Sequence, residues 1–241
     1  MHKITMVASA AITVALFSFY HPAQTKDNEL STAEKKAGWK LLFDGKSTDS
    51  WRAYQNIAND SWEVLNGELH CKQDGVTKRA DLITKDEYAS FELQADWKVS
   101  KGANSGILYH VLETHRASYE TGPEYQLIDD LGYEGKLEGW QKSGADYAMH
   151  PPLKIASKPV GEYNHARIVV KGDHVEHWLN GEKVADFHAW TPEWGKLKKE
   201  GKWKDYPDYG IAKSGYIALQ DHGGGIWFKN IKIRELVVTR N

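Results

Sequence analysis

Apolar and polar residues alternate in short runs along most of the chain. Between Phe91 and Val99 apolar side chains occupy every second position, and polar residues fill the positions between them. A two-residue period places successive side chains on opposite faces of a β-strand, so this segment is expected to have one buried face. Similar runs recur along the chain, separated by Gly, Asn, Asp and Pro. This punctuation is typical of antiparallel strands joined by turns.

Turn sequences support the predicted strand pairs. Asn66-Gly67 is the strongest short signal for a hairpin, and Gly172-Asp173 and Asn180-Gly181 mark two further turns. Strands are expected at residues 62–65, 68–71, 91–99, 167–171, 174–179, 215–220 and 226–238. Only residues 192–199 have an amphipathic helical pattern. The pattern therefore predicts an all-β sandwich or barrel built from two antiparallel sheets.

The N-terminus has the order of a secretory signal. His2 and Lys3 precede an apolar run at residues 4–20, and Pro22-Ala23 follows it. That run is short for a spanning helix and contains hydroxyl residues, so stable membrane insertion is not expected. We predict a signal peptide at 1–23, a polar tether or short helix at 24–38, and one domain at 39–241, exported to the periplasm or the extracellular space.

Composition narrows the function classes. The chain of 241 residues carries 31 basic and 33 acidic residues, so no net field attracts nucleic acid. Ten Trp and twelve Tyr provide flat surfaces that suit packing against sugar rings, although Trp is also common in cores. Cys71 is the only cysteine and cannot form an intramolecular disulfide. A sugar or oligosaccharide is therefore the expected ligand.

Candidate site residues lie where strand alternation leaves polar groups together. Glu124 and Gln126 share the face opposite Tyr125 and Leu127, where a carboxylate and an amide could bind the same substrate hydroxyls. Gln220 and His222 likewise share one side of a later strand. A solvated sheet face and a turn histidine are the structural alternatives.

Three further candidates come from turns and loops. Asn104 lies in a Gly-flanked turn that enters an apolar strand, and Tyr109 follows in the same segment. His150 precedes two prolines in an extended loop. Asn104 could instead occupy a left-handed turn position. The irregular segment 190–211, rich in Trp, Lys and Tyr, is long enough to form a wall or lid.

These segments carry a family resemblance from about Gly38 to Leu236. The motifs are Gly38-Trp39-Lys40-Leu41-Leu42-Phe43-Asp44-Gly45-Lys46, Asn104-Ser105-Gly106-Ile107, Gly122-Pro123-Glu124-Tyr125-Gln126, Gly161-Glu162-Tyr163-Asn164, Trp178-Leu179-Asn180-Gly181 and Leu219-Gln220-Asp221-His222-Gly223. In this order they resemble the 3-keto-disaccharide hydrolase domain family, a concanavalin-like jelly roll of exported bacterial proteins. His110 departs from the pattern, because the family is expected to have Arg there more often.

The resemblance implies cleavage of glycosides whose sugar is oxidised to a ketone at C3. A C3 carbonyl acidifies the C2 hydrogen, so a general base can start an elimination that expels the glycosidic oxygen, and water then adds. The implied base is His222 or Glu124, with Asp221 positioning His222, while Gln126 and Asn104 orient hydroxyls or the enolate. An oxidoreductase that forms the 3-keto-sugar is an implied functional partner.

The sequence establishes no cofactor, and the implied chemistry leaves open a divalent metal that would stabilise the enolate in a site without Arg. Glu124, Asp129 and His222 are the candidate ligands, and their spacing alone does not define a site.

Two other functions are compatible with the same pattern. A noncatalytic carbohydrate-binding module would use the groove and its aromatic residues without an acid or base. A conventional glycoside hydrolase on this fold would need paired carboxylates, as in a Glu-x-Asp-x-Glu strand, and residues 91–97 supply only Glu92 and Asp96.

Overall fold

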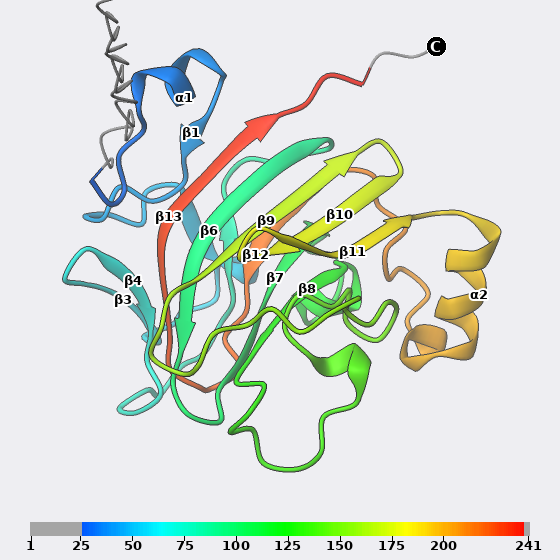
Figure 1. The fold of residues 1–241 in the computed structure, drawn as a ribbon. Helices are drawn as coiled ribbons and strands as arrows, with labels where there is room; N and C mark the ends of the chain where they lie inside the picture. The colour runs from blue at the N-terminus through cyan, green and yellow to red at the C-terminus, as the bar shows by residue number, and fades with distance from the viewer. Residues whose placement is uncertain (1–25, 239–241) are drawn as a thin grey trace, which may run out of the picture.

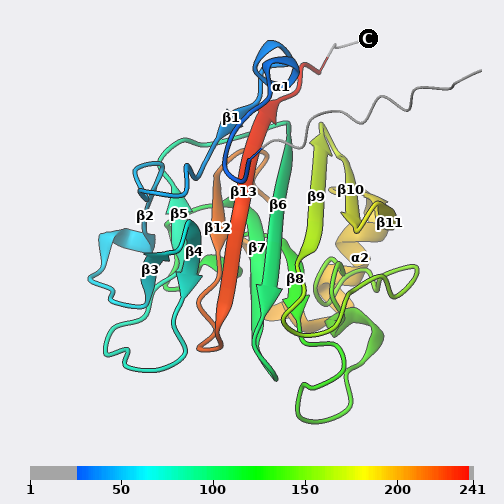
Figure 2. The same ribbon diagram turned by 60° about the vertical axis from the view of Figure 1, so that its left-hand side comes forward.

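The computed structural model describes residues 26–238, so the predicted signal peptide at 1–23 lies outside the described residues. Two antiparallel sheets pack face to face (Figures 1 and 2), which confirms the predicted all-β jelly-roll sandwich. Within residues 26–238 no helix has both the length and the apolar character needed to cross a membrane.

The larger sheet, sheet A, has eight strands in the order β11-β10-β9-β6-β13-β4-β3, and β1 also pairs with β13. Its strands are β1 (Lys40–Leu41), β3 (Trp62–Leu65), β4 (Glu68–Cys71), β6 (Phe91–Val99), β9 (Asn164–Lys171), β10 (His174–Leu179), β11 (Glu182–His188) and β13 (Ile226–Glu235). The predicted hairpins at Asn66-Gly67 and Gly172-Asp173 are both present, as β3–β4 and β9–β10.

The smaller sheet, sheet B, has five strands in the order β2-β5-β12-β7-β8. They are β2 (Trp51–Ala53), β5 (Leu82–Thr84), β12 (Tyr216–Leu219), β7 (Asn104–Val111) and β8 (Glu124–Ile128). Apart from the consecutive strands β7 and β8, neighbouring strands of sheet B come from distant parts of the sequence, so its outer face gathers side chains that no local motif contains.

The core fills the space between the sheets. Sheet A contributes alternate residues of its central strands, including Leu93, Trp97 and Phe228, which are at most 1% exposed. Sheet B contributes Tyr125 and Leu127 from β8, which are fully buried. Because every second side chain of β8 is used by the core, the residues between them must face the outside of the sandwich.

Helices are few and lie outside the sheets. Within residues 26–238 the α-helices are α1 (Thr32–Lys36) and α2 (Pro192–Glu200), and the 3-10 turns are η1 (Tyr54–Asn56), η2 (Ser118–Glu120), η3 (Gly139–Gln141) and η4 (Lys202–Asp205). Figure 1 places α2 beside β11 at one edge of the sandwich and α1 beside β1. The helical pattern at 192–199 is confirmed.

The segment between residues 190 and 211 is closed at its base. Trp190 donates its Nε1–H to the carbonyl oxygen of Gly210 at 2.7 Å, and its ring stacks on His110. Gly210 has a φ of +63°, and a Cβ there would lie 2.2 Å from the Trp194 ring. These contacts fix the ends of the segment, so η4 is held as part of the fold.

Residues Asp27 and Asn28, within the predicted tether, bind the outer face of sheet A. Asn28 and Asn230 exchange two hydrogen bonds, from each backbone N–H to the other side-chain oxygen, at 2.6 and 2.8 Å. Asn28 also donates to the carbonyl oxygen of Gly67, and Lys229 pairs with Asp27 at 2.7 Å. Asn230 lies at a bulge of β13 with a φ of +54°. The first described residues are thus attached to the domain.

Replacing Asn230 tests this attachment. Asn230→Gly keeps the positive φ and the backbone bond to Asn28 Oδ1. It removes the side-chain bonds to the Asn28 N–H and to the Asp27 and Asp96 carboxylates, so we expect a loss of about 1–3 kcal/mol in the free energy of unfolding. Asn230→Ala should lose about 1–2 kcal/mol more, because a Cβ is strained in the left-handed region. Urea denaturation measures both, and equal stability of wild type and Asn230→Gly would contradict the structural role.

Candidate active site

Five of the predicted site residues line one cavity of about 270 Å³ on the outer face of sheet B. They are Asn104, Glu124, Gln126, Gln220 and His222. Three strands supply them, since β7 begins at Asn104, β8 carries Glu124 and Gln126, and Gln220 directly follows β12. Strand pairing therefore assembles a polar site from three separate motifs.

Glu124 is the most unusual group in the cavity. Glu124 is only 4% exposed, and its carboxylate accepts no hydrogen bond from residues 26–238. Burial raises the pKa of the carboxyl to about 8, opposed by the nearby charge of Lys202. The side chain crosses Gly106, where a Cβ would lie 2.2 Å from Glu124 Oε1. Glycine is therefore required below the carboxylate.

The amides are arranged around this carboxylate by β7 and β8. Gln126 donates its Nε2–H to Asn104 Oδ1 at 3.2 Å and to the carbonyl oxygen of Gln141 at 3.1 Å. Asn104 is thereby oriented with its Nδ2 group left to bind substrate. The Gln220 backbone is fixed to β7 by bonds with Gly106 and Ser105, while its side chain enters the cavity.

His222 is exposed at the rim of the cavity. Asp221 was predicted to position the His222 ring, but its carboxylate binds other groups. The Asp221 carboxylate instead pairs with Arg79 Nη1 at 2.8 Å and accepts the N–H of Gly223. Adjacent residues of an extended segment point in opposite directions, so Asp221 turns away from the side shared by Gln220 and His222. The predicted positioning of His222 by Asp221 has no direct contact to support it.

Aromatic residues and one lysine complete the cavity, and the sequence motifs had not identified them. Its remaining lining residues are Tyr119, Tyr147, Lys202, Trp203 and Tyr206. Trp203 is 1% exposed, stacks on Tyr209 with 4.0 Å between ring centroids, and donates to the carbonyl oxygen of Tyr147. The only sequence signal was the Trp- and Lys-rich composition of residues 190–211, which does form a wall.

Lys202 brings a positive charge to the cavity. Its Nζ lies 4.2 Å from the centroid of the Tyr147 ring and 4.9 Å from that of Trp203. Partial burial lowers the pKa of Lys202 below its usual value, and the nearby Glu124 charge opposes that change. Lys202 and Glu124 therefore form an electrostatic pair in which each affects the protonation of the other.

Two predicted substrate-binding residues do not line the cavity. Tyr109 is 2% exposed and faces the core, with its hydroxyl 3.3 Å from His177 Nε2. It lies five residues after Asn104 on the same strand, and an odd separation puts it on the opposite face. His150 hydrogen-bonds Asp146 at 2.9 Å and stacks on Phe187, so its ring is engaged in packing.

Only two of the three candidate metal ligands, Glu124 and His222, line the same cavity. Asp129 accepts backbone N–H groups of Gly102 and Gly132, each at 2.8 Å, and does not line the cavity with Glu124 and His222. Its carboxylate closes a turn, as expected of Asp directly after a strand. The structure thus gathers two of the three candidate ligands.

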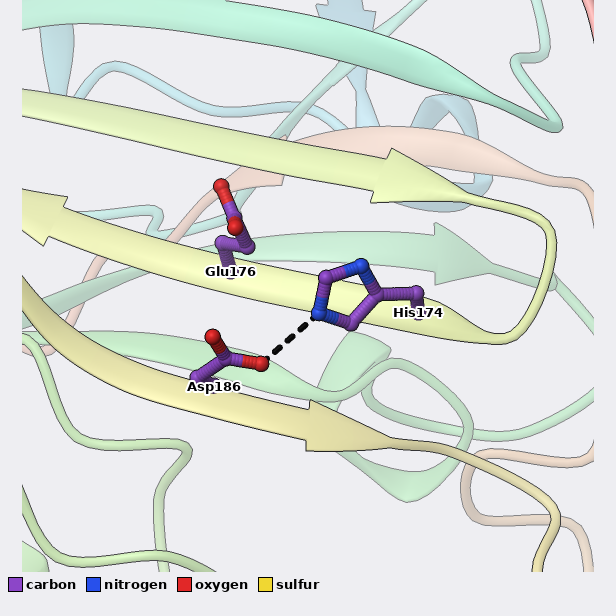
Figure 3. Close-up of side chains that lie close together, drawn as sticks. All are labelled: His174, Glu176 and Asp186. Carbon is purple, nitrogen blue, oxygen red and sulfur yellow. Dashed lines mark hydrogen bonds and ion pairs between the residues drawn. The ribbon is translucent and has the colours of Figure 1, made fainter.

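A different group of potential ligands, His174, Glu176 and Asp186, lies on β10 and β11 (Figure 3). His174 Nε2 is 2.7 Å from Asp186 Oδ1, as the dashed line in Figure 3 shows. Lys183 Nζ bonds both carboxylates, at 2.6 Å to Glu176 and 2.7 Å to Asp186. An ammonium already neutralises these acids, so the cluster is an ion-pair network of the sheet surface.

Comparisons with known proteins agree with this architecture. Residues 38–234 match the model of the 3-keto-alpha-glucoside-1,2-lyase-like domain. A Bacteroides thetaiotaomicron protein named 3-keto-disaccharide hydrolase is 32% identical over 228 residues, covering 83% of this chain and 79% of its own length.

Two crystal structures of Parabacteroides distasonis proteins, both inferred to be glycosyl hydrolases, have the same fold. One is 41% identical with a TM-score of 0.82 and covers 88% of this chain and 100% of its own. The other is 29% identical with a TM-score of 0.64 and covers 82% and 99%. With the family model spanning nearly all of the described residues, this chain belongs to the 3-keto-alpha-glucoside-1,2-lyase-like domain family.

Proposed function

We propose that this protein is a carbohydrate-active hydrolase that cleaves the glycosidic bond of 3-keto-glycosides or 3-keto-disaccharides. The family and the name of the B. thetaiotaomicron relative support a sugar substrate. The observation that carries the proposal is Glu124, a buried carboxyl with a pKa of about 8 that faces a polar cavity and has no hydrogen-bond partner within residues 26–238. A core or surface role does not account for such a group.

Glu124 is proposed to remove the C2 proton of the bound keto-sugar. The C–H electron pair becomes an enolate that extends to the C3 oxygen. When the enolate collapses, the C3 carbonyl re-forms, a C1–C2 double bond forms and the C1–O bond breaks. His222 at the rim gives the leaving oxygen its proton. Water then adds across the double bond, with oxygen to C1 and a proton returned to C2, giving net hydrolysis.

Lys202 is proposed to stabilise the enolate. Its ammonium lies in the same cavity as Glu124, and a positive charge near the C3 oxygen would be worth most in a partly buried site. The raised pKa of Glu124 makes its carboxylate a stronger base than an exposed one. Asn104 and Gln220 would bind the remaining hydroxyls and hold the C2 hydrogen toward Glu124.

The proposed substrate implies an earlier reaction. A 3-keto-glycoside arises when a sugar C3 hydroxyl is oxidised, and the elimination proposed here consumes that ketone without forming it. We therefore propose that a separate sugar 3-oxidoreductase supplies the substrate.

Turnover of a chromogenic 4-nitrophenyl 3-keto-glucoside, in both anomers, tests the proposal. Glu124→Gln should lower kcat/KM by about 10²–10⁴-fold, because an amide cannot accept the C2 proton. His222→Gln should lower it by a smaller factor, because 4-nitrophenolate leaves readily without a proton from the donor. The matched controls are Glu182→Gln and His188→Gln, on β11 of sheet A, which should retain full activity. If wild type binds sugars but releases no nitrophenol, the protein is a binding module.

The pH dependence provides a second prediction. Glu124 must be ionised to act as a base, so kcat/KM should rise with pH through about 8. It should fall again as the groups that must carry a proton lose it. One of them is Lys202, whose pKa is lowered from the usual lysine value of 10.5 by partial burial. A rising limb centred near the ordinary glutamate pKa would contradict the assignment of Glu124 as the base.

We also propose that the chain is exported after cleavage at the end of residues 1–23. Expression of the full sequence in a Gram-negative host should then yield mature protein that begins at Gln24 in the periplasmic fraction. Mass spectrometry of the intact protein measures the N-terminus, and an uncleaved cytoplasmic product would contradict export.

A further inference from the structure

A second cavity borders the candidate active site. It measures about 390 Å³ and shares Tyr119, Gln220 and His222 with the first cavity. On the proposed function, His222 protonates the leaving oxygen, so the group beyond that oxygen would extend past this shared wall. Two adjoining cavities separated by the proton donor are the arrangement that a two-part substrate requires.

The second cavity offers apolar surface to its occupant. Ile57 and Tyr119 are 48% and 37% exposed, although both are large hydrophobic residues. Tyr119 is supported edge-to-face by Tyr206 at 6.2 Å, and Tyr54 is held by bonds from its hydroxyl to the carbonyl oxygens of Leu112 and His115. A flat ring in the cavity would cover this surface.

One unpaired positive charge faces the same space. Arg79 is already used, since Nη1 pairs with Asp221 and Nη2 donates to the carbonyl oxygen of Gln73 at 2.7 Å. Arg116, by contrast, is exposed and forms no ion pair within residues 26–238. Its guanidinium is therefore available to an anionic group.

The acid at the base of the cavity does not cancel this charge. Asp81 accepts the N–H of Asp221 at 2.8 Å and the hydroxyl of Ser118. Burial raises the pKa of its carboxyl, which disfavours the charged form. Both oxygens of Asp81 accept hydrogen bonds from the protein, whereas the described part of the chain gives Arg116 no ion-pair partner.

We propose that the second cavity is a leaving-group subsite selective for a planar ring that carries a carboxylate. This inference rests on the proposed function, because the first cavity must hold the keto-sugar. The ring packs on Tyr119 and Ile57, and the carboxylate pairs with Arg116. The subsite thereby determines which glycosides are cleaved fastest.

The test compares 4-carboxyphenyl with 4-carbamoylphenyl 3-keto-glucoside, which differ mainly in charge. Wild type should favour the carboxylate by about three- to tenfold in kcat/KM, and the preference should shrink at high ionic strength. Arg116→Gln should abolish the ratio. Lys101→Gln, which removes one exposed positive charge beside a separate cavity, should leave it unchanged. Equal ratios in wild type and Arg116→Gln would overturn the subsite.

A binding measurement separates this inference from the proposed function. Calorimetry with the free leaving groups, 4-hydroxybenzoate and 4-hydroxybenzamide, requires no turnover. If no keto-glycoside is cleaved but wild type binds the acid more tightly than the amide and Arg116→Gln does not, the proposed function fails and the anion subsite stands. If wild type binds both compounds equally, the subsite is overturned whatever the turnover result.

Discussion

The two-residue alternation along β8 is the constraint on which the site depends. Tyr125 and Leu127 are fixed in the core by complete burial, so Glu124 and Gln126 must face outward. The neighbouring strand β7 passes below Glu124 with a glycine at position 106, which leaves room for the acid side chain. Core packing thus determines where the Glu124 carboxyl lies, and the low exposure of that carboxyl raises its pKa.

The sequence predicted those parts of the site that obey strand periodicity. Glu124 and Gln126 were predicted to share one face, as were Gln220 and His222, because residues two positions apart lie on the same side of a strand in any fold. The same rule, applied to β7 from Asn104, would have placed Tyr109 in the core. The same alternation explains why Asp221 does not contact His222, since Asp221 lies between two neighbours that face the cavity.

The rest of the cavity could not be predicted, because it depends on contacts between segments far apart in sequence. Lys202 reaches the site since Trp203 stacks on Tyr209 and donates to Tyr147, some 56 residues away in the chain. No local sequence pattern predicts that these two segments come into contact. The composition of residues 190–211 indicated a wall but not which side chains would face the substrate. His110, the departure from the family pattern, supports this segment through Trp190 and does not line the cavity.

The attachment of Asp27 and Asn28 has a consequence for how the protein meets its substrate. These residues bind the outer face of sheet A, whereas the candidate site opens on the outer face of sheet B. The first residues that the structure describes are therefore held on the side of the sandwich opposite the mouth of the site. A carrier, surface or fusion partner joined directly to Asp27 would stand behind the domain and would leave the approach of a bulky glycoside unobstructed.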